Sequence, residues 1–253
     1  MALSACLALA LALLGASFVP EESTLEAIVR GRAFKWEMRS QPPFRREAAR
    51  MGAVRAFRAG WSGVGTSDQR ALCAFRAGEL LRAGDLDEGA LAEFASGAAL
   101  RSSPWSHRSA LAGGKMLADR GRRAEALRIL KLASKEGVPS RFAEPAALMR
   151  GVLLAEMGRR DSAAELWREV AIDGLTPLVR LEAFELWGQQ FLEDGDIEGA
   201  AGVLHLCRER LSAVSCEATE RGEELRARLM CSRLATAIRG EVLLRRGSAD
   251  QGE

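Results

Sequence analysis

The stretch from Gly121 to Pro139, GRRAEALRILKLASKEGVP, begins with a glycine that recurs at a fixed interval along the chain. Its counterparts begin the stretches GDLDEGA, GRRDSAA and GDIEGAA, so that each glycine follows the previous one by 37 residues. The four glycines are Gly84, Gly121, Gly158 and Gly195. A constant period of this length is typical of stacked repeat proteins. The sequence therefore predicts four copies of one structural unit.

Each copy has the pattern of a helical hairpin. Seven residues before the glycine stands a small residue and four before it a bulky apolar one, which places both on one helical face. These residues are Ala77, Gly114, Gly151 and Gly188, and Leu80, Leu117, Leu154 and Phe191. A second small residue follows the glycine by five positions, as Gly89, Ala126, Ala163 and Ala200. A large residue follows by nine positions, as Leu130, Trp167 and Leu204, while the first copy has Phe94 ten positions on. Because glycine permits the positive φ that ends a helix, each copy should contain two antiparallel helices joined by a tight turn.

This pattern resembles the tetratricopeptide repeat (TPR), which has small residues in both helices, glycine in the turn and a proline near its end. The resemblance covers about residues 70–210 and is closest in the stretch quoted above. The period of 37 exceeds the ~34 residues usual in that family. Sel1-like repeats, the nearer alternative family, place their additional residues inside a unit, whereas here they lie between units, as in SKEGVPSRFAEP. We therefore expect an all-α, right-handed α-solenoid of stacked antiparallel hairpins, with four TPR-like repeats over residues 70–212.

The first 19 residues contain no charged side chain, and Gly15, Ala16 and Ser17 precede Pro20. An apolar run that ends in small residues is typical of a secretory signal peptide, and this run also approaches the length of a membrane span. We expect residues 1–17 to be a signal peptide, and the chain to be exported to the periplasm or the extracellular space. The alternative is an uncleaved segment that anchors the chain in a membrane.

Residues 22–60 are expected to form a basic helical pair. Ser23 is the expected N-cap, and the prolines of SQPPF separate the two helices. Between Arg30 and Arg58, nine Lys or Arg residues stand against two glutamates, a balance of +7. The pair is either a degenerate repeat or a separate hairpin. Because Phe34, Trp36 and Met38 alternate with other residues, a short strand is an alternative for residues 34–38.

The glycine-rich residues 61–69 are expected to be a linker. The stretch GWSGVGTSD contains neither the second glycine of a nucleophile elbow nor the lysine of a phosphate-binding loop. We expect Ser67 or Asp68 to cap the helix that follows.

The period breaks after the fourth repeat. Residues 213–247 are expected to form one long helix that caps the array, with its apolar face at Leu225, Leu229, Leu234, Ile238 and Val242, and residues 248–253 a disordered tail. The spacings of Cys207, Cys216 and Cys231 match no zinc pattern. These cysteines are expected to be buried thiols or, in an exported chain, to supply a disulfide. Cys216 is the expected partner in that disulfide because it falls in the loop AVSCEAT.

The sequence favours a non-catalytic scaffold that binds a peptide or a partner helix on its concave repeat surface. It offers no convergent catalytic set, and we expect no cofactor, metal or small-molecule substrate. The TPR resemblance implies a groove lined by Arg108, Lys115, Glu185 and Gln189. With a net charge of only +2, the chain is no general polyanion binder. The alternative function is binding of nucleic acid or an acidic surface by the basic N-terminal helices.

Overall fold

The computed structural model describes residues 23–100, 103–134, 137–214, 229, 231–240 and 242. Within these ranges the chain is helical, as predicted, apart from turns and one isolated bridge between Ser23 and Val64. Residues 1–22, where a signal peptide or anchor is expected, lie outside the described residues, and so do Cys216, Leu225 and residues 248–253. The chain divides into two compact units, residues 1–105 and 106–253, and each is described by itself.

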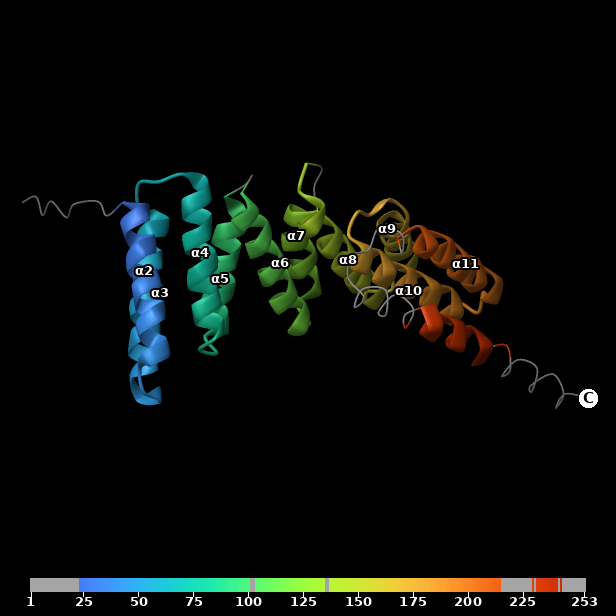
Figure 1. Ribbon diagram of the computed structural model, residues 1–253, viewed down its shortest axis with the longest axis horizontal. Helices are drawn as coiled ribbons and strands as arrows, with labels where there is room; N and C mark the ends of the chain where they lie inside the picture. Colours follow the sequence, from blue (N-terminus) through green and yellow to red (C-terminus); the bar gives the residue numbers. More distant parts are fainter. Residues whose placement is uncertain are drawn as a thin grey trace, which may run out of the picture. The chain divides into compact units, whose positions relative to one another are not determined.

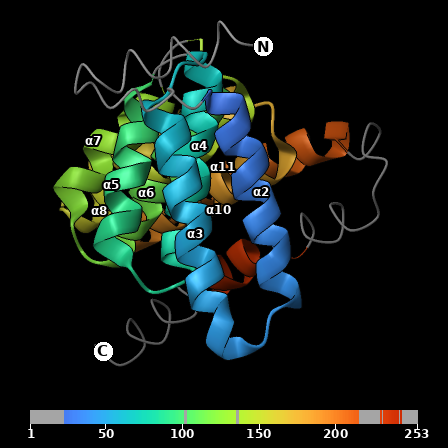
Figure 2. The ribbon, with the colours of Figure 1, turned by 90° about the vertical axis from the view of Figure 1, so that its left-hand side faces the viewer.

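The first unit consists of consecutive helices that contact one another. They are α2 (Thr24–Ser40), α3 (Pro43–Ser62), α4 (Ser67–Arg82) and α5 (Asp87–Ala99). Figure 2 shows α2 and α3 side by side as a hairpin. A Cβ atom at Gly31 of α2 would lie 2.6 Å from the ring of Phe57, so the glycine allows α3 to approach closely. Because α2 continues to Ser40, the short strand considered for residues 34–38 is wrong.

Two helices of the first unit, α2 and α4, begin with reciprocal caps, whereas α3 and α5 have no side-chain cap. Ser23 is the N-cap of α2, as predicted, with Glu26 N–H donating to its Oγ at 3.3 Å and Ser23 N–H donating to Glu26 Oε2 at 3.1 Å. For α4 the cap is Thr66, paired with Gln69 in the same way, so the expectation of Ser67 or Asp68 is wrong. Thr66 directly precedes the first residue of α4, so its hydroxyl is within reach of the N–H of Gln69, the third residue of the helix.

The second unit continues with helices joined by alternating turns and connections. They are α6 (Pro104–Asp119, whose first two residues belong to the first unit), α7 (Arg123–Ala133), α8 (Ser140–Glu156), α9 (Arg160–Asp173), α10 (Pro177–Glu193) and α11 (Ile197–Val214). From α7 to α11 each helix contacts the next, and α8 also contacts α10 (Figure 1). The first helices of the third and fourth repeats, α8 and α10, therefore lie beside each other.

The four turns within hairpins share one hydrogen-bond pattern. A residue with positive φ is followed by an N–H that donates to the carbonyl five residues before it, which is a Schellman motif. The donor and acceptor pairs are Leu86 and Leu81 (3.0 Å), Arg122 and Leu117 (2.9 Å), Arg159 and Leu154 (2.8 Å), and Asp196 and Phe191 (2.8 Å). Gly121, Gly158 and Gly195 take the positive φ, at 71°, 77° and 76°, as the glycine period predicts.

In the first repeat the register differs from the prediction by one residue. The positive φ of 56° belongs to Asp85, not to Gly84. The first interval between equivalent turns is therefore 36 residues, and the next two are 37. This shift explains why Phe94 stands one position late when counted from Gly84.

The corrected register pairs a glycine on the first helix with a large side chain 16 residues later on the second. A Cβ atom would lie 2.7 Å from Phe94 at Gly78, and 2.5 Å from Leu130 at Gly114. At Gly151 it would meet the indole of Trp167, whose Nε1 donates to the carbonyl of Leu148 at 3.3 Å. Each hairpin is thus closed by a side chain that fills the hollow over a glycine.

The fourth hairpin is closed by a different segment. The atoms nearest to a Cβ at Gly188 belong to Leu234, at 2.8 Å, in the helical residues 231–240. Leu234 and Ala235 are buried in the core of the unit, and Ile238 packs against it. Leu229, expected on the same apolar face, is 54% exposed. Residues 231–240 therefore pack on the hairpin of α10 and α11.

Candidate partner-binding site

The second unit contains an open groove between α10 and residues 231–240. Its volume is about 440 Å³. One wall comes from α10 and the other from the C-terminal segment, and the lining residues are Glu185, Gln189, Leu192, Glu193, Arg233, Leu234 and Ala237. Because Leu234 fills the hollow over Gly188, the same contact that docks the segment also builds the groove.

A second, smaller hollow of about 180 Å³ lies between α8 and α10. It shares Gln189 and Glu193 with the first groove, and Val152, Leu186 and the buried Trp167 give it an apolar floor. The two hollows therefore border the same strip of α10. We call this strip, with the residues that line both hollows, the α10 groove.

The α10 groove has an acidic side. Glu185 lines the groove, and Glu182 lies three residues before it on α10. Neither has a cationic partner among the described residues, whereas the Glu193 carboxylate lies 3.4 Å from Arg160. Partial desolvation and the neighbouring charge of Glu185 raise the pKa of Glu182. Two uncompensated carboxylates on one helical face attract a cation, and a partner that brings one would relieve their repulsion.

The charge changes along the equivalent positions of the three first helices of this unit. These positions are occupied by Arg108 and Lys115 in α6, by Pro145 and Val152 in α8, and by Glu182 and Gln189 in α10. The face is thus basic at α6, apolar at α8 and acidic at α10. A bound segment with a matching sequence of charges would have a defined direction along it.

The structure separates the four residues expected to line the binding surface. Glu185 and Gln189 lie together in the α10 groove. Arg108 and Lys115 are exposed on α6 and do not line either hollow. The sequence interpretation missed Arg233, which faces the groove from the C-terminal segment. The predicted apolar face of that segment was the available signal, because it contains Leu234 one residue later.

A buried carboxylate fixes the start of α10. Glu144 of α8 is 8% exposed and accepts hydrogen bonds from the N–H groups of Leu175, at 2.6 Å, and Thr176, at 2.8 Å. Thr176 is the N-cap of α10, so the carboxylate satisfies backbone donors that the helix itself leaves unpaired. This contact holds α10 against α8 at the end of the groove.

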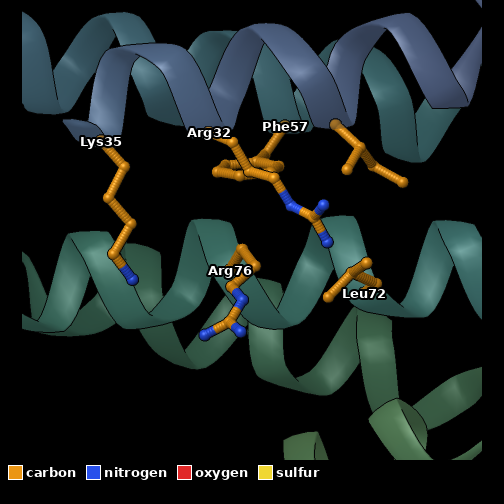
Figure 3. Close-up of a pocket in the computed structure, with 6 residues that line it drawn as sticks. Arg32, Lys35, Phe57, Leu72 and Arg76 are labelled. Atoms are coloured by element: carbon orange, nitrogen blue, oxygen red, sulfur yellow. The ribbon is translucent and has the colours of Figure 1, made fainter. Parts of the chain in front are cut away.

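The first unit has a small basic pocket of about 100 Å³ that is lined by α2, α3 and α4. Arg32 and Lys35 extend from α2 toward α4, and Phe57 and Leu72 form apolar walls (Figure 3). Arg76 also borders the pocket, but its Nη1 lies 2.5 Å from Glu79 Oε2 and its guanidinium stacks 5.3 Å from the ring of Trp105.

Arg32 and Lys35 differ from Arg76 in their electrostatic state. Within the described part of the chain, neither has a carboxylate within ion-pair distance. Arg32 is exposed and Lys35 is half-buried, so both charges are accessible at the rim of an apolar pocket. Two accessible charges at the rim of an apolar pocket distinguish the basic face of α2 from an ordinary solvated helix surface.

Among the described residues, no group of three or more His, Cys, Asp or Glu side chains has the arrangement of a metal site. No helix in the described ranges is both long and apolar enough to cross a membrane.

The hairpins, their turns and their glycine contacts define an all-α, TPR-like repeat fold. The chain is structurally similar to two TPR proteins, PilF of Pseudomonas aeruginosa and MamA. The match to MamA covers 68% of this chain and 94% of the other, with 16% identity and a TM-score of 0.49. The match to PilF covers 82% and 93%, with 15% identity and a TM-score of 0.48. No family model matches the sequence, and a search of the curated proteins gives no match.

Proposed function

We propose that the chain is a non-catalytic scaffold that binds another protein through the α10 groove. The observation that carries this proposal is an open groove that combines an apolar floor with the Glu185 carboxylate, which has no cationic partner among the described residues and lies close to Glu182 on the same helix. Apolar contacts supply affinity in such a site, and charges at its rim fix the register of the bound segment. TPR-like arrays in general offer their first-helix surfaces to partners in this way.

The chemistry of the groove defines the partner. Glu185, with Glu182 three residues before it on α10, favours a Lys or Arg, while Leu192 and Leu234 favour an apolar side chain next to it. Arg233 on the facing wall would bind a carboxylate of the same partner segment by donating hydrogen bonds to it. We infer that the partner presents a short helix or extended peptide in which apolar anchors alternate with basic residues and at least one acidic residue.

A charge-reversal experiment tests this function. The full chain is used as bait in cross-linking capture from its native cell, and the recovered protein is then purified and titrated. Glu185→Lys should weaken binding of that protein at least about tenfold, because it replaces an attraction by a repulsion. The matched control is Glu165→Lys, which makes the same charge change at an exposed position of α9 outside the groove.

Two results would contradict the proposal. One is equal affinity of the wild-type chain, the Glu185→Lys variant and a Gln189→Ala variant for the captured protein. The other is a loss of affinity in the Glu165→Lys control. Arg108→Ala and Lys115→Ala extend the test to α6, and reduced affinity in both would show that the bound segment reaches the basic end of the face.

A second candidate function is suggested by Arg32 and Lys35. Among the described residues these two charges have no ion-pair partner, and beside an apolar pocket they fit an acidic side chain or surface of a partner. A double variant, Arg32→Ala with Lys35→Ala, should then abolish salt-sensitive binding to an acidic peptide and leave the α10 groove unaffected. Binding of DNA but not of the acidic peptide, lost in the variant, would indicate nucleic acid instead.

Export remains a proposal that rests on the apolar run of residues 1–17. Mass spectrometry of the chain from its native cell tests it. An intact N-terminus in a soluble fraction would eliminate both export and anchoring.

A further inference from the structure

Two cysteines that lie 24 residues apart in the sequence meet in the fourth hairpin. The sulfur atoms of Cys207 and Cys231 are 2.9 Å apart. Cys207 is on α11 and is 3% exposed, whereas Cys231 begins the helical residues 231–240 and is half-buried. Both thiols are free in this structure. The fold therefore brings together a buried and an accessible thiol from two separate elements.

Packing on both sides holds the two thiols in place. Leu234 and Ala235 of the C-terminal segment are buried in one core with Val203 and Leu204 of α11. Cys207 belongs to the same core, and Cys231 packs against it. Because these contacts fix both backbones, the approach of the sulfur atoms follows from the docking of two helices and not from the flexibility of two side chains.

The electrostatics of the pair separates the roles of the two sulfurs. The two thiols share a hydrogen bond in which either sulfur can be the donor, and this bond and the charge of Arg208 lower the pKa of Cys231, against the effect of burial. The same hydrogen bond and burial raise the pKa of Cys207. A half-buried thiol with a lowered pKa is the group that reacts first with an oxidant.

We propose that Cys207 and Cys231 form a disulfide that fastens residues 231–240 to α11. The oxidant is a small-molecule disulfide such as oxidised glutathione, or the disulfide of a thiol oxidoreductase. The Cys231 thiolate attacks one sulfur of that disulfide, which forms a mixed disulfide and releases one thiolate. Cys207 loses its proton and attacks the Cys231 sulfur, which forms the internal bond and releases the second thiolate. The chain loses two hydrogen atoms, and the oxidant gains two electrons and two protons.

The pairing differs from the one expected from the sequence, where the loop position of Cys216 made it the natural partner. Here the partner is Cys231, because Leu234 brings its helix to Gly188 and α11. The bond also has a consequence for binding, which rests on the proposed function. Arg233 lies two residues from Cys231, so the disulfide holds one wall of the α10 groove in place.

Peptide mapping of the full chain tests the pairing without any partner. The chain is equilibrated in glutathione buffers from reducing to oxidising, quenched with acid, unfolded, alkylated with N-ethylmaleimide and digested without reduction. We expect a peptide that joins Cys207 to Cys231. Burial raises the pKa of Cys73 to about 12, so this thiol should remain alkylatable only after unfolding and serve as an internal control.

Serine variants decide between the possible bonds. Cys216→Ser and Cys73→Ser should retain the internal disulfide, whereas Cys207→Ser and Cys231→Ser should abolish it. A bond from Cys216 to either partner, or fully alkylated thiols under the most oxidising condition, would overturn the proposal. Circular dichroism of each variant under reducing conditions confirms that it is folded before its thiols are mapped.

Thermal melts test whether the bond fastens the segment. Oxidation should raise the melting temperature of the wild-type chain by roughly 5–10 °C, because the bond closes a loop of 24 residues. The Cys231→Ser chain should melt at the same temperature in both buffers. Coincident melts of oxidised and reduced wild-type chains would contradict the fastening role. Affinity for the captured partner is measured afterwards in both redox states, so a failure of the groove proposal stays distinct from a failure of the disulfide.

Discussion

The turn glycines offer a direct test of the repeat register. Gly121 and Gly158 have φ values of 71° and 77°, and a Cβ atom at either position would meet no atom within 4 Å. Alanine at these sites therefore introduces backbone strain without a steric clash, and the left-handed conformation costs about 1–2 kcal/mol. Gly84 does not have a positive φ, because Asp85 takes that conformation in the first repeat. Gly84→Ala should instead leave the free energy of unfolding unchanged or raise it by about 0.4–1 kcal/mol.

Urea and thermal unfolding, followed by far-ultraviolet circular dichroism, measure these differences. We expect Gly121→Ala and Gly158→Ala each to lower the melting temperature by about 2–8 °C. A Cβ atom at Gly84 would meet the guanidinium of Arg50, so Gly84→Ala is also measured in an Arg50→Ala background, where this contact is absent. If Gly84→Ala were as destabilising as Gly121→Ala in that background, the register derived from Asp85 would be refuted. A Gly121→Ala chain as stable as the wild type would refute the strain argument itself.

Three further perturbations test packing, capping and protonation. Gly151→Leu should cost about 1–3 kcal/mol by overpacking against Trp167, whereas Gly202→Leu, on an open surface of α11, should be neutral or stabilising in the same urea titration. Glu144→Gln should cost about 1–3 kcal/mol in urea unfolding, because it replaces a carboxylate that accepts two backbone N–H groups. Burial lowers the pKa of His107 below 6.5, so the unfolded chain binds the proton more readily and stability should fall as the pH drops through that value. Melts between about pH 8 and pH 5 should show a smaller loss in a His107→Gln variant.

The repeats could be predicted because the turn glycines and the large residues of the second helices recur in the sequence itself. The error in the first repeat arose where two candidates stood side by side. Ala77 and Gly78 are both small, and Gly84 precedes an aspartate that tolerates positive φ. Phe94, one position late against Gly84, was the sequence signal for the shift. The large residue that closes a hairpin defines the repeat register more reliably than a turn residue does, because the residue that it contacts on the first helix has to be small.

The candidate site was predictable only in part. Glu185 and Gln189 follow from the register of α10, since equivalent positions recur in α6 and α8. The position of Arg233 cannot be derived from that register, because Arg233 belongs to a segment that follows the break in the 37-residue period. Only the fit of Leu234 over Gly188 brings that segment to the groove, and such a tertiary contact leaves no periodic pattern. The same fit decided the pairing of Cys231 with Cys207.

The hollow over Gly188 makes the last hairpin dependent on a segment that is distant in sequence. In the other hairpins the closing side chain comes from the adjoining helix, so each is complete by itself. The fourth hairpin accepts Leu234 from residues 231–240, which begin 17 residues after Val214, where α11 ends, in the sequence. A second copy of the chain offers an identical Leu234, so two copies that exchange these segments would keep every contact of the fourth hairpin. The contact of Leu234 with Gly188 could therefore also form between two chains in a domain-swapped dimer. A Cys207–Cys231 disulfide formed within one chain beforehand would prevent the exchange.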